Sequence, residues 1–293
     1  EPEFHRVIEY VTANHLDHSG RWLDALAAFD TLFVKLDESP NSGWIRGAAT
    51  VQRSYVRKLL GQLGRLRGEL PELVAHARDL GIRHELVSLG CLRAHVLAIY
   101  GERDAAQRLL AEMREQWHAR QVTFQHIILA MTEVELALLD GRPRDALDVV
   151  ERVLGNTKTR IVATMMPSHV EVYELRARCL LHLALAGEDG THAAIRRDLA
   201  KLRKSHKPQV GPLARLLDAG LCVVMGDAQG AAAHWRDAAA QLDALGMAAH
   251  LAAVHARLGA QGDAAAEAKA RAYFEAEQLD AAQRLVAALA PGR

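Results

Sequence analysis

The chain has 293 residues, of which 50% are hydrophobic and 25% charged, and its 36 basic residues are balanced by 36 acidic ones. This composition is typical of a folded globular protein and excludes disordered, collagen-like and disulfide-scaffold proteins. A chain without net charge has no overall field that would attract nucleic acid or an anionic membrane. No apolar run approaches the roughly 20 residues that cross a bilayer, and no secretion signal begins the chain, so we expect a cytoplasmic protein. Because the first residue is Glu1, we also expect a piece of a longer polypeptide.

Strand signals are almost absent, because aromatic residues make up 5% of the chain and β-branched residues do not alternate with polar ones. The prolines fall where the apolar period is interrupted, as expected between helices. The sequence therefore predicts an all-α fold with a long connection over 155–167. In chain order, the predicted helices cover 3–18, 21–37, 43–66, 70–80, 83–100, 103–119, 123–140, 143–154, 167–186, 190–205, 210–225, 228–245, 248–259 and a terminal stretch over 264–289.

The predicted turns repeat one pattern, in which a glycine is followed five residues later by alanine and four residues after that by a large apolar residue. Glycine suits the positive-φ position that ends a helix, and alanine allows the next helix to approach closely. Weaker copies lie near Gly68 and over 187–190. The four clear copies are Gly20, Ala25 and Phe29; Gly101, Ala106 and Leu110; Gly141, Ala146 and Val150; and Gly226, Ala231 and Trp235.

This pattern resembles the tetratricopeptide repeat, although most units here are longer than its usual period of about 34 residues. The resemblance implies a single domain over 1–293: a right-handed α-solenoid of about six to seven helix pairs, in which each unit contacts its neighbours.

The last third of the chain carries a narrower resemblance, to the C-terminal repeat region of bacterial, especially myxobacterial, serine/threonine kinases and related signalling ATPases. This resemblance implies a regulatory or protein-binding region near the end of a signalling protein. The residues that carry it are Gly226 and Asp227, His234 and Trp235, 242–247, 256–259, Tyr273 and Phe274, and 289–292.

Motifs for catalysis are missing from the sequence. It contains no kinase signature, no phosphate-binding loop, no nucleophile elbow and no His-Glu-x-x-His helix. His15 and His18 are interpreted as exposed residues near a turn rather than metal ligands, because no third ligand is in view. We therefore expect no enzymatic activity, no cofactor and no metal. The basic stretch over 195–207 is interpreted as a solvated helix face rather than a nucleic-acid site.

Candidate binding residues follow from the first helix of each pair, which lines the concave groove of a tetratricopeptide solenoid. Donors and flat aromatic faces there could receive a helical or extended segment that carries carboxylates. The alternative is that the register slips in the long repeats and several of these residues belong to the core. Counting back from each turn glycine gives Tyr10, Asn14, Tyr55, Lys58, Gln62, Arg65, His95 and Glu135 as the predicted groove.

The sequence thus favours a non-catalytic protein-interaction module of a bacterial signalling protein, as the C-terminal region of a serine/threonine kinase. Its expected partner is a protein or peptide segment, acidic if it binds the predicted groove, or the catalytic domain of the same polypeptide. We expect neither a membrane nor a nucleic-acid partner. The alternative is a sensor that binds a peptide or small molecule, as tetratricopeptide domains of transcription regulators and nucleotide-binding switch proteins do.

Overall fold

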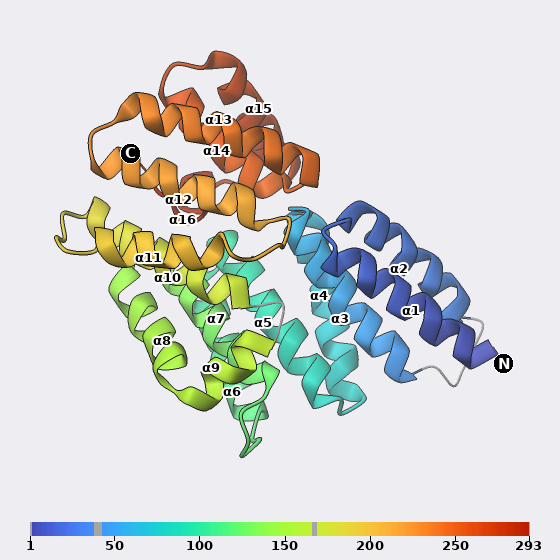
Figure 1. Cartoon of the computed structure of the whole chain (residues 1–293). Coiled ribbons are helices and arrows are strands. Elements are labelled where there is room, and N and C mark those ends of the chain that lie inside the picture. The colour runs from blue at the N-terminus through green and yellow to red at the C-terminus, as the bar shows by residue number, and fades with distance from the viewer. Residues whose placement is uncertain (1, 38–42, 166–168, 293) are drawn as a thin grey trace.

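A computed structural model describes residues 2–37, 43–165 and 169–292, and over these residues the chain forms helices and no strand (Figure 1). The predicted all-α fold is confirmed. None of the helices in this part of the chain is both long and apolar enough to cross a lipid bilayer. The helices are α1 (Pro2–His18), α2 (Trp22–Asp37), α3 (Gly43–Leu59), α4 (Leu63–Asp79), α5 (Arg83–Ile99), α6 (Arg103–Gln116), α7 (Phe124–Leu139), α8 (Pro143–Gly155), α9 (Thr157–Met165), α10 (His169–Leu185), α11 (His192–Leu202), α12 (Val210–Val224), α13 (Ala228–Leu245), α14 (Ala248–Ala260), α15 (Ala264–Ala276) and α16 (Ala282–Leu289).

Glycines with positive φ end many of these helices. The four clear copies of the turn pattern are confirmed, with φ between 70° and 84° at their glycines. The alanines that follow are buried, as expected where two helices approach closely. The same conformation occurs at six further glycines, of which Gly61 and Gly81 end α3 and α4 and were not predicted; the others are Gly187, Gly190, Gly246 and Gly262.

The boundary predicted between 43–66 and 70–80 is wrong. Helix α3 ends at Leu59, the turn passes through Gly61 with φ of 73°, and α4 already begins at Leu63. Gly68 and Pro71 therefore lie inside α4 rather than at a turn. Both residues are exposed. The backbone hydrogen bond that a proline removes from a helix is therefore missing on the solvent side of α4.

Two other regions also differ from the prediction. The connection predicted over 155–167 contains α9, and this helix packs against α7 and α8. The terminal stretch predicted over 264–289 is divided into α15 and α16. The chain turns between them at Gln278, whose φ of 55° is the one positive value among the described residues other than glycine.

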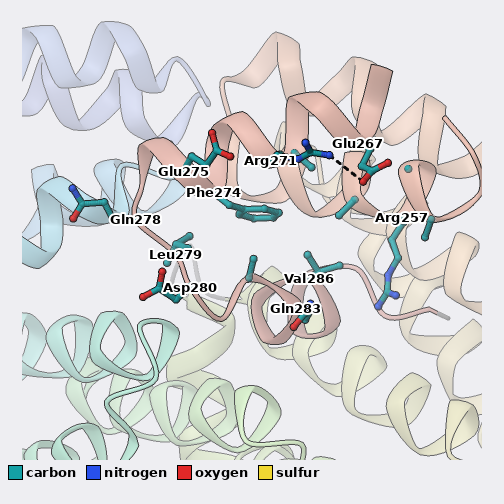
Figure 2. Close-up of a pocket in the computed structure, with 15 residues that line it drawn as sticks. Arg257, Glu267, Arg271, Phe274, Glu275, Gln278, Leu279, Asp280, Gln283 and Val286 are labelled. Carbon is teal, nitrogen blue, oxygen red and sulfur yellow. Dashed lines mark hydrogen bonds and ion pairs between the residues drawn. The ribbon is translucent and has the colours of Figure 1, made fainter. Parts of the chain in front are cut away.

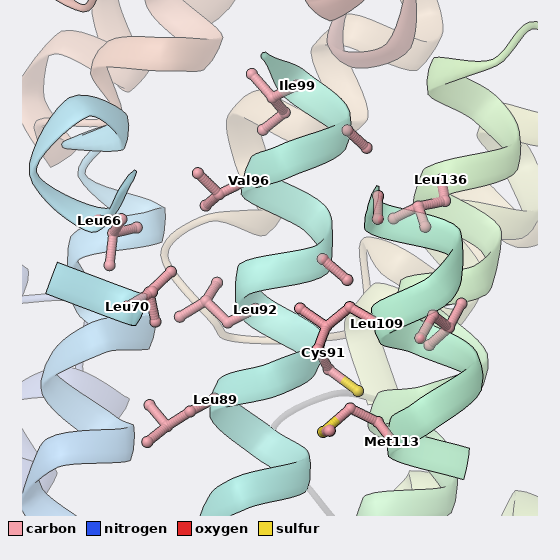
Figure 3. Close-up of a cluster of buried hydrophobic side chains, with 14 of the residues drawn as sticks. Leu66, Leu70, Leu89, Cys91, Leu92, Val96, Ile99, Leu109, Met113 and Leu136 are labelled. Atoms are coloured by element: carbon pink, nitrogen blue, oxygen red, sulfur yellow. The ribbon is translucent and has the colours of Figure 1, made fainter. Parts of the chain in front are cut away.

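Consecutive helices pack as hairpins: α1 with α2, α5 with α6, α7 with α8, α10 with α11, α12 with α13, and α14 with α15. Helix α3 packs against α4 as well, although α4 packs more closely against α5. The first helices of successive pairs also contact one another, so that α5 lies against α3 and α7, and α10 against α7 and α12. Figure 3 shows how α5 packs between α4 and α6 through side chains such as Leu70, Leu92 and Met113, which are at most 2% exposed.

The last helices return to the early ones. Tyr273 of α15 donates a hydrogen bond from Oη to the carbonyl oxygen of Gly61, over 2.7 Å. Tyr100, directly after α5, donates to the carbonyl oxygen of Glu277, also over 2.7 Å. Helix α16 packs against α7 and α14, and Arg178 of α10 donates to the carbonyl oxygen of Ala288 over 2.9 Å. The C-terminal segment therefore covers part of the side of α3, α5 and α7 that the sequence predicts to be an open groove.

Gly61→Ala should destabilise the protein more than Gly141→Ala. Both glycines have a φ near 70°, so each alanine costs roughly 1–2 kcal/mol of left-handed backbone strain. At Gly61 an added Cβ would also lie 2.5 Å from the backbone nitrogen of Ala249, whereas at Gly141 nothing lies within 4 Å. That clash should add about 1–3 kcal/mol. Urea unfolding of both variants measures the difference; equal losses would show that α14 does not pack against this turn.

Candidate functional site

Three of the predicted groove residues meet inside the molecule, each from a different first helix. Lys58 of α3 donates from Nζ to both carboxylate oxygens of Glu135 on α7, over 3.0 Å each. The third residue is His95 of α5, whose Nδ1 lies 2.6 Å from Glu135 Oε2. The side chains of Lys58, His95 and Glu135 are 27%, 9% and 18% exposed. The three helices thus bring a cation, an imidazole and a carboxylate to one mostly buried point.

The charges of this group balance within the chain. Burial alone would raise the pKa of the Glu135 carboxyl, but His95, Lys58 and Arg178 outweigh it and hold that pKa well below its usual value. Burial lowers the pKa of the His95 imidazole, although Glu135 opposes the shift. The Glu135 carboxylate is thus held between the side chains of Lys58 and His95, both within hydrogen-bond distance of it.

Sequence reasoning missed the residues that complete this interior. Arg178 of α10 is bound by Glu174, with its Nη2 at 3.1 Å from Oε2. Burial lowers the pKa of His182 to about 4 and that of His250 on α14 to about 3, in both cases with help from Arg178. A signal was available on α10, where Glu174, Arg178 and His182 recur every fourth residue and so share one face of the helix. We name Lys58, His95, Glu135, Glu174, Arg178, His182 and His250 the interior polar cluster.

Tyr10 and Asn14 lie on α1, outside the interior polar cluster. The ring of Tyr10 packs against Phe29 and Trp44, with centroid distances of 6.4 and 6.3 Å, so it belongs to the contact of α1 with α2 and α3. Asn14 is half-buried on the same helix. Tyr55 is on α3, half-buried against the hydrophobic core around α5.

Gln62 and Arg65 do not lie on α3, the helix that the prediction over 43–66 assigns to them. Gln62 directly precedes α4. Arg65 lies on α4, where its side chain is 56% exposed and donates from Nε to Glu69 over 2.8 Å. The turn glycine is Gly61, seven residues before Gly68, from which the groove positions follow in the sequence pattern. Seven residues are almost two helical turns, and for that reason Lys58 still faces the interior.

The cations of the predicted groove are already paired with carboxylates of this chain. Lys58 is bound to Glu135 and Arg65 to Glu69. The neighbouring Arg57 is fully buried, and it contacts Glu69 and also Asp30 at 3.6 Å. An acidic partner would have to displace these carboxylates, so the geometry does not favour the predicted acidic segment at this place.

A hollow of about 1010 Å³ lies at the opposite end of the chain, between α14, α15 and α16 (Figure 2). Its inner wall is apolar, with Phe274 and Val286 among small alanines. Charged side chains stand at its margin. Arg271 donates to Glu267 over 3.2 Å, and Arg257 donates from Nε to the carbonyl oxygen of Ala290 over 2.8 Å. We call this hollow the end groove.

The described residues include no group of three or more His, Cys, Asp or Glu side chains placed to hold a metal ion. All three cysteines are free and buried. Burial raises the pKa of the Cys91 and Cys179 thiols to about 12, so neither is a thiolate at neutral pH. In comparisons with known proteins, no family model, no curated protein and no solved structure matches this chain.

Acid should destabilise the fold through His182 and His250, whose side chains are half-buried. The folded-state pKa values of His182 and His250 lie below the ordinary value of 6.5, so below that pH the unfolded chain binds protons that the folded chain does not. Their contribution is complete above pH 6.5 and is lost as the pH falls towards the folded-state pKa, about 4 for His182 and about 3 for His250, at up to about 1.4 kcal/mol per pH unit for each group. Urea unfolding between pH 7 and about pH 4.5 measures how much unfolding free energy is lost on acidification. The loss should be smaller in His182→Gln than in the unchanged chain, and the same in the control His118→Gln, which changes an exposed histidine. An equal loss in His182→Gln would contradict the lowered pKa of His182.

Charge reversal should destabilise the protein much more at Lys58 than at Arg65, although the sequence predicts both cations in one groove. Lys58→Glu puts a second carboxylate against Glu135 in the interior and should cost roughly 3–5 kcal/mol of unfolding free energy. Arg65→Glu removes an exposed ion pair within α4 and should cost less than about 1 kcal/mol. Urea unfolding of the single variants measures both values. Similar losses would show that Lys58 is not part of a buried cluster.

Proposed function

We propose that the chain is a non-catalytic protein-interaction module, a right-handed α-solenoid of tetratricopeptide-like helix pairs. Successive hairpins turn at positive-φ glycines such as Gly20, Gly101 and Gly141, and the first helices α5, α7, α10 and α12 form a continuous series of contacts. Both features support an array of similar units. Such arrays present long surfaces on which other proteins bind.

The observation that carries the proposed activity is the end groove. It is a concave surface with an apolar wall and a charged margin, which are the features of a site for a protein segment. The interior polar cluster serves less well as a binding surface, because its charged groups already pair with one another. The function therefore resides at the α14–α16 end of the chain rather than in the groove predicted from the sequence.

The proposed setting is the C-terminal regulatory region of a bacterial serine/threonine kinase. This part of the proposal is supported by the resemblance of the last third of the sequence to such regions. Several residues that carry the resemblance, among them Ala256, Arg257 and Phe274, line the end groove. The partner is then another signalling protein or the catalytic domain of the same polypeptide.

Panning a displayed library of random peptides of about 16 residues, a length that can form a helix on a partner surface, tests the interaction function. The folded chain should enrich peptides that bind with micromolar or lower Kd, and these peptides should raise its Tm. An unrelated all-α protein of similar size serves as the control. If no peptide is enriched beyond this control while a small molecule raises the Tm, the chain is a small-molecule sensor and the proposal is wrong.

A further inference from the structure

We infer that the end groove binds an amphipathic α-helix with basic side chains at one end. The inference rests on the proposed interaction function and deepens it, because it names the surface and the chemistry of the partner. It depends on the shape of the groove, on the packing of α15 and on the charges at the margin.

The shape of the groove fits a helix. The α15 residues of the lining recur at intervals of three and four, through Glu267, Ala270, Arg271, Phe274 and Glu275. They form one stripe along most of α15, a helix whose 13 residues extend about 20 Å. Gln283 and Val286 of α16 lie across the groove from Phe274 (Figure 2), and Ala256 and Ala260 of α14 complete the lining. A partner helix with apolar residues at i, i+3, i+4 and i+7 would pack its side chains against this lining.

The packing of α15 leaves the side of this helix that lines the end groove uncovered. In a stack of helix pairs, the next first helix would lie against the last pair, which here is α14 and α15. The eight-residue α16 packs against α14 and α7 instead, and within the described chain α15 packs mainly against α14. A foreign helix would therefore occupy the place that a further helix of the array would take.

The charges at the margin select the partner. Arg271 is paired with Glu267, and Arg257 is bound to the carbonyl oxygen of Ala290. The remaining charged groups of the lining are the carboxylates of Glu275 and Asp280, both exposed. Figure 2 shows these two at the same end of the groove, on opposite sides of it, with Arg257 at the other end. Lysine or arginine at one end of the partner would neutralise them, whereas an acidic partner would be repelled.

Two synthetic peptides of about 16 residues test the inference. Both have leucine at i, i+3, i+4 and i+7, and one carries lysines at one end where the other carries glutamates. By fluorescence anisotropy, the lysine peptide should bind the full chain at least about tenfold more tightly than the glutamate peptide. The double variant Glu275→Lys and Asp280→Lys should reverse this preference. The matched control Glu72→Lys and Glu115→Lys, which changes two exposed carboxylates on α4 and α6, should leave it unchanged.

A steric variant localises the binding. Ala260 is exposed and lines the end groove, so the side chain of Ala260→Trp should fill the groove without disturbing the core. This variant should bind the lysine peptide at least about tenfold more weakly. Equal affinity of the two peptides, or binding that Ala260→Trp does not weaken, would overturn the inference. Library peptides whose affinity for the chain is the same with and without Ala260→Trp would also overturn the inference. That result would leave the proposed interaction function intact.

Discussion

The return of the last helices to the first ones is the constraint on which the rest of the structure depends. Its most specific element is the hydrogen bond from Tyr273 to the carbonyl oxygen of Gly61. Burial raises the pKa of the Tyr273 phenol far above its ordinary value, with Glu277 adding to the shift, so the group is a permanent donor. Gly61 is required at the contact because a side chain there would collide with the backbone of Ala249. A residue with no Cβ thus allows α14 to approach the α3–α4 turn.

This closure explains why the charged groups of the interior polar cluster are paired with one another. Once α16 lies against α7, the polar side of the first helices no longer faces bulk water. A buried charge without a partner costs several kcal/mol, so Lys58 is matched by Glu135 and Arg178 by Glu174. The histidines that remain are neutral, because burial lowers their pKa values. The charges of the interior polar cluster therefore serve internal contacts, whereas the α14–α16 end presents a groove with an apolar inner wall and charged residues at its margin.

The local parts of the fold were predictable from the sequence, since a turn glycine and a following alanine act within a few residues. The failure near Gly61 has a local cause as well: glycines stand at 61, 64 and 68, and Leu66 takes the place where the pattern has alanine. The end groove was not predictable, because it depends on the break at Gln278, which no glycine or proline marks. The ion pair of Lys58 with Glu135 was not predictable either, because Glu135 is 77 residues away in the sequence. Only the packing of α3, α5 and α7 brings the two side chains together.

The distance between the α15–α16 turn and α4 tests the closure most directly. Nitroxide labels at Gly68→Cys and Asp280→Cys, both exposed positions, can be measured by double electron–electron resonance, because the three native cysteines are buried and should not react. The closed arrangement predicts a single, short and narrow distance distribution. A broad distribution or a long mean distance would show that the last helices do not return to the first, and would contradict the origin proposed here for both the interior polar cluster and the end groove.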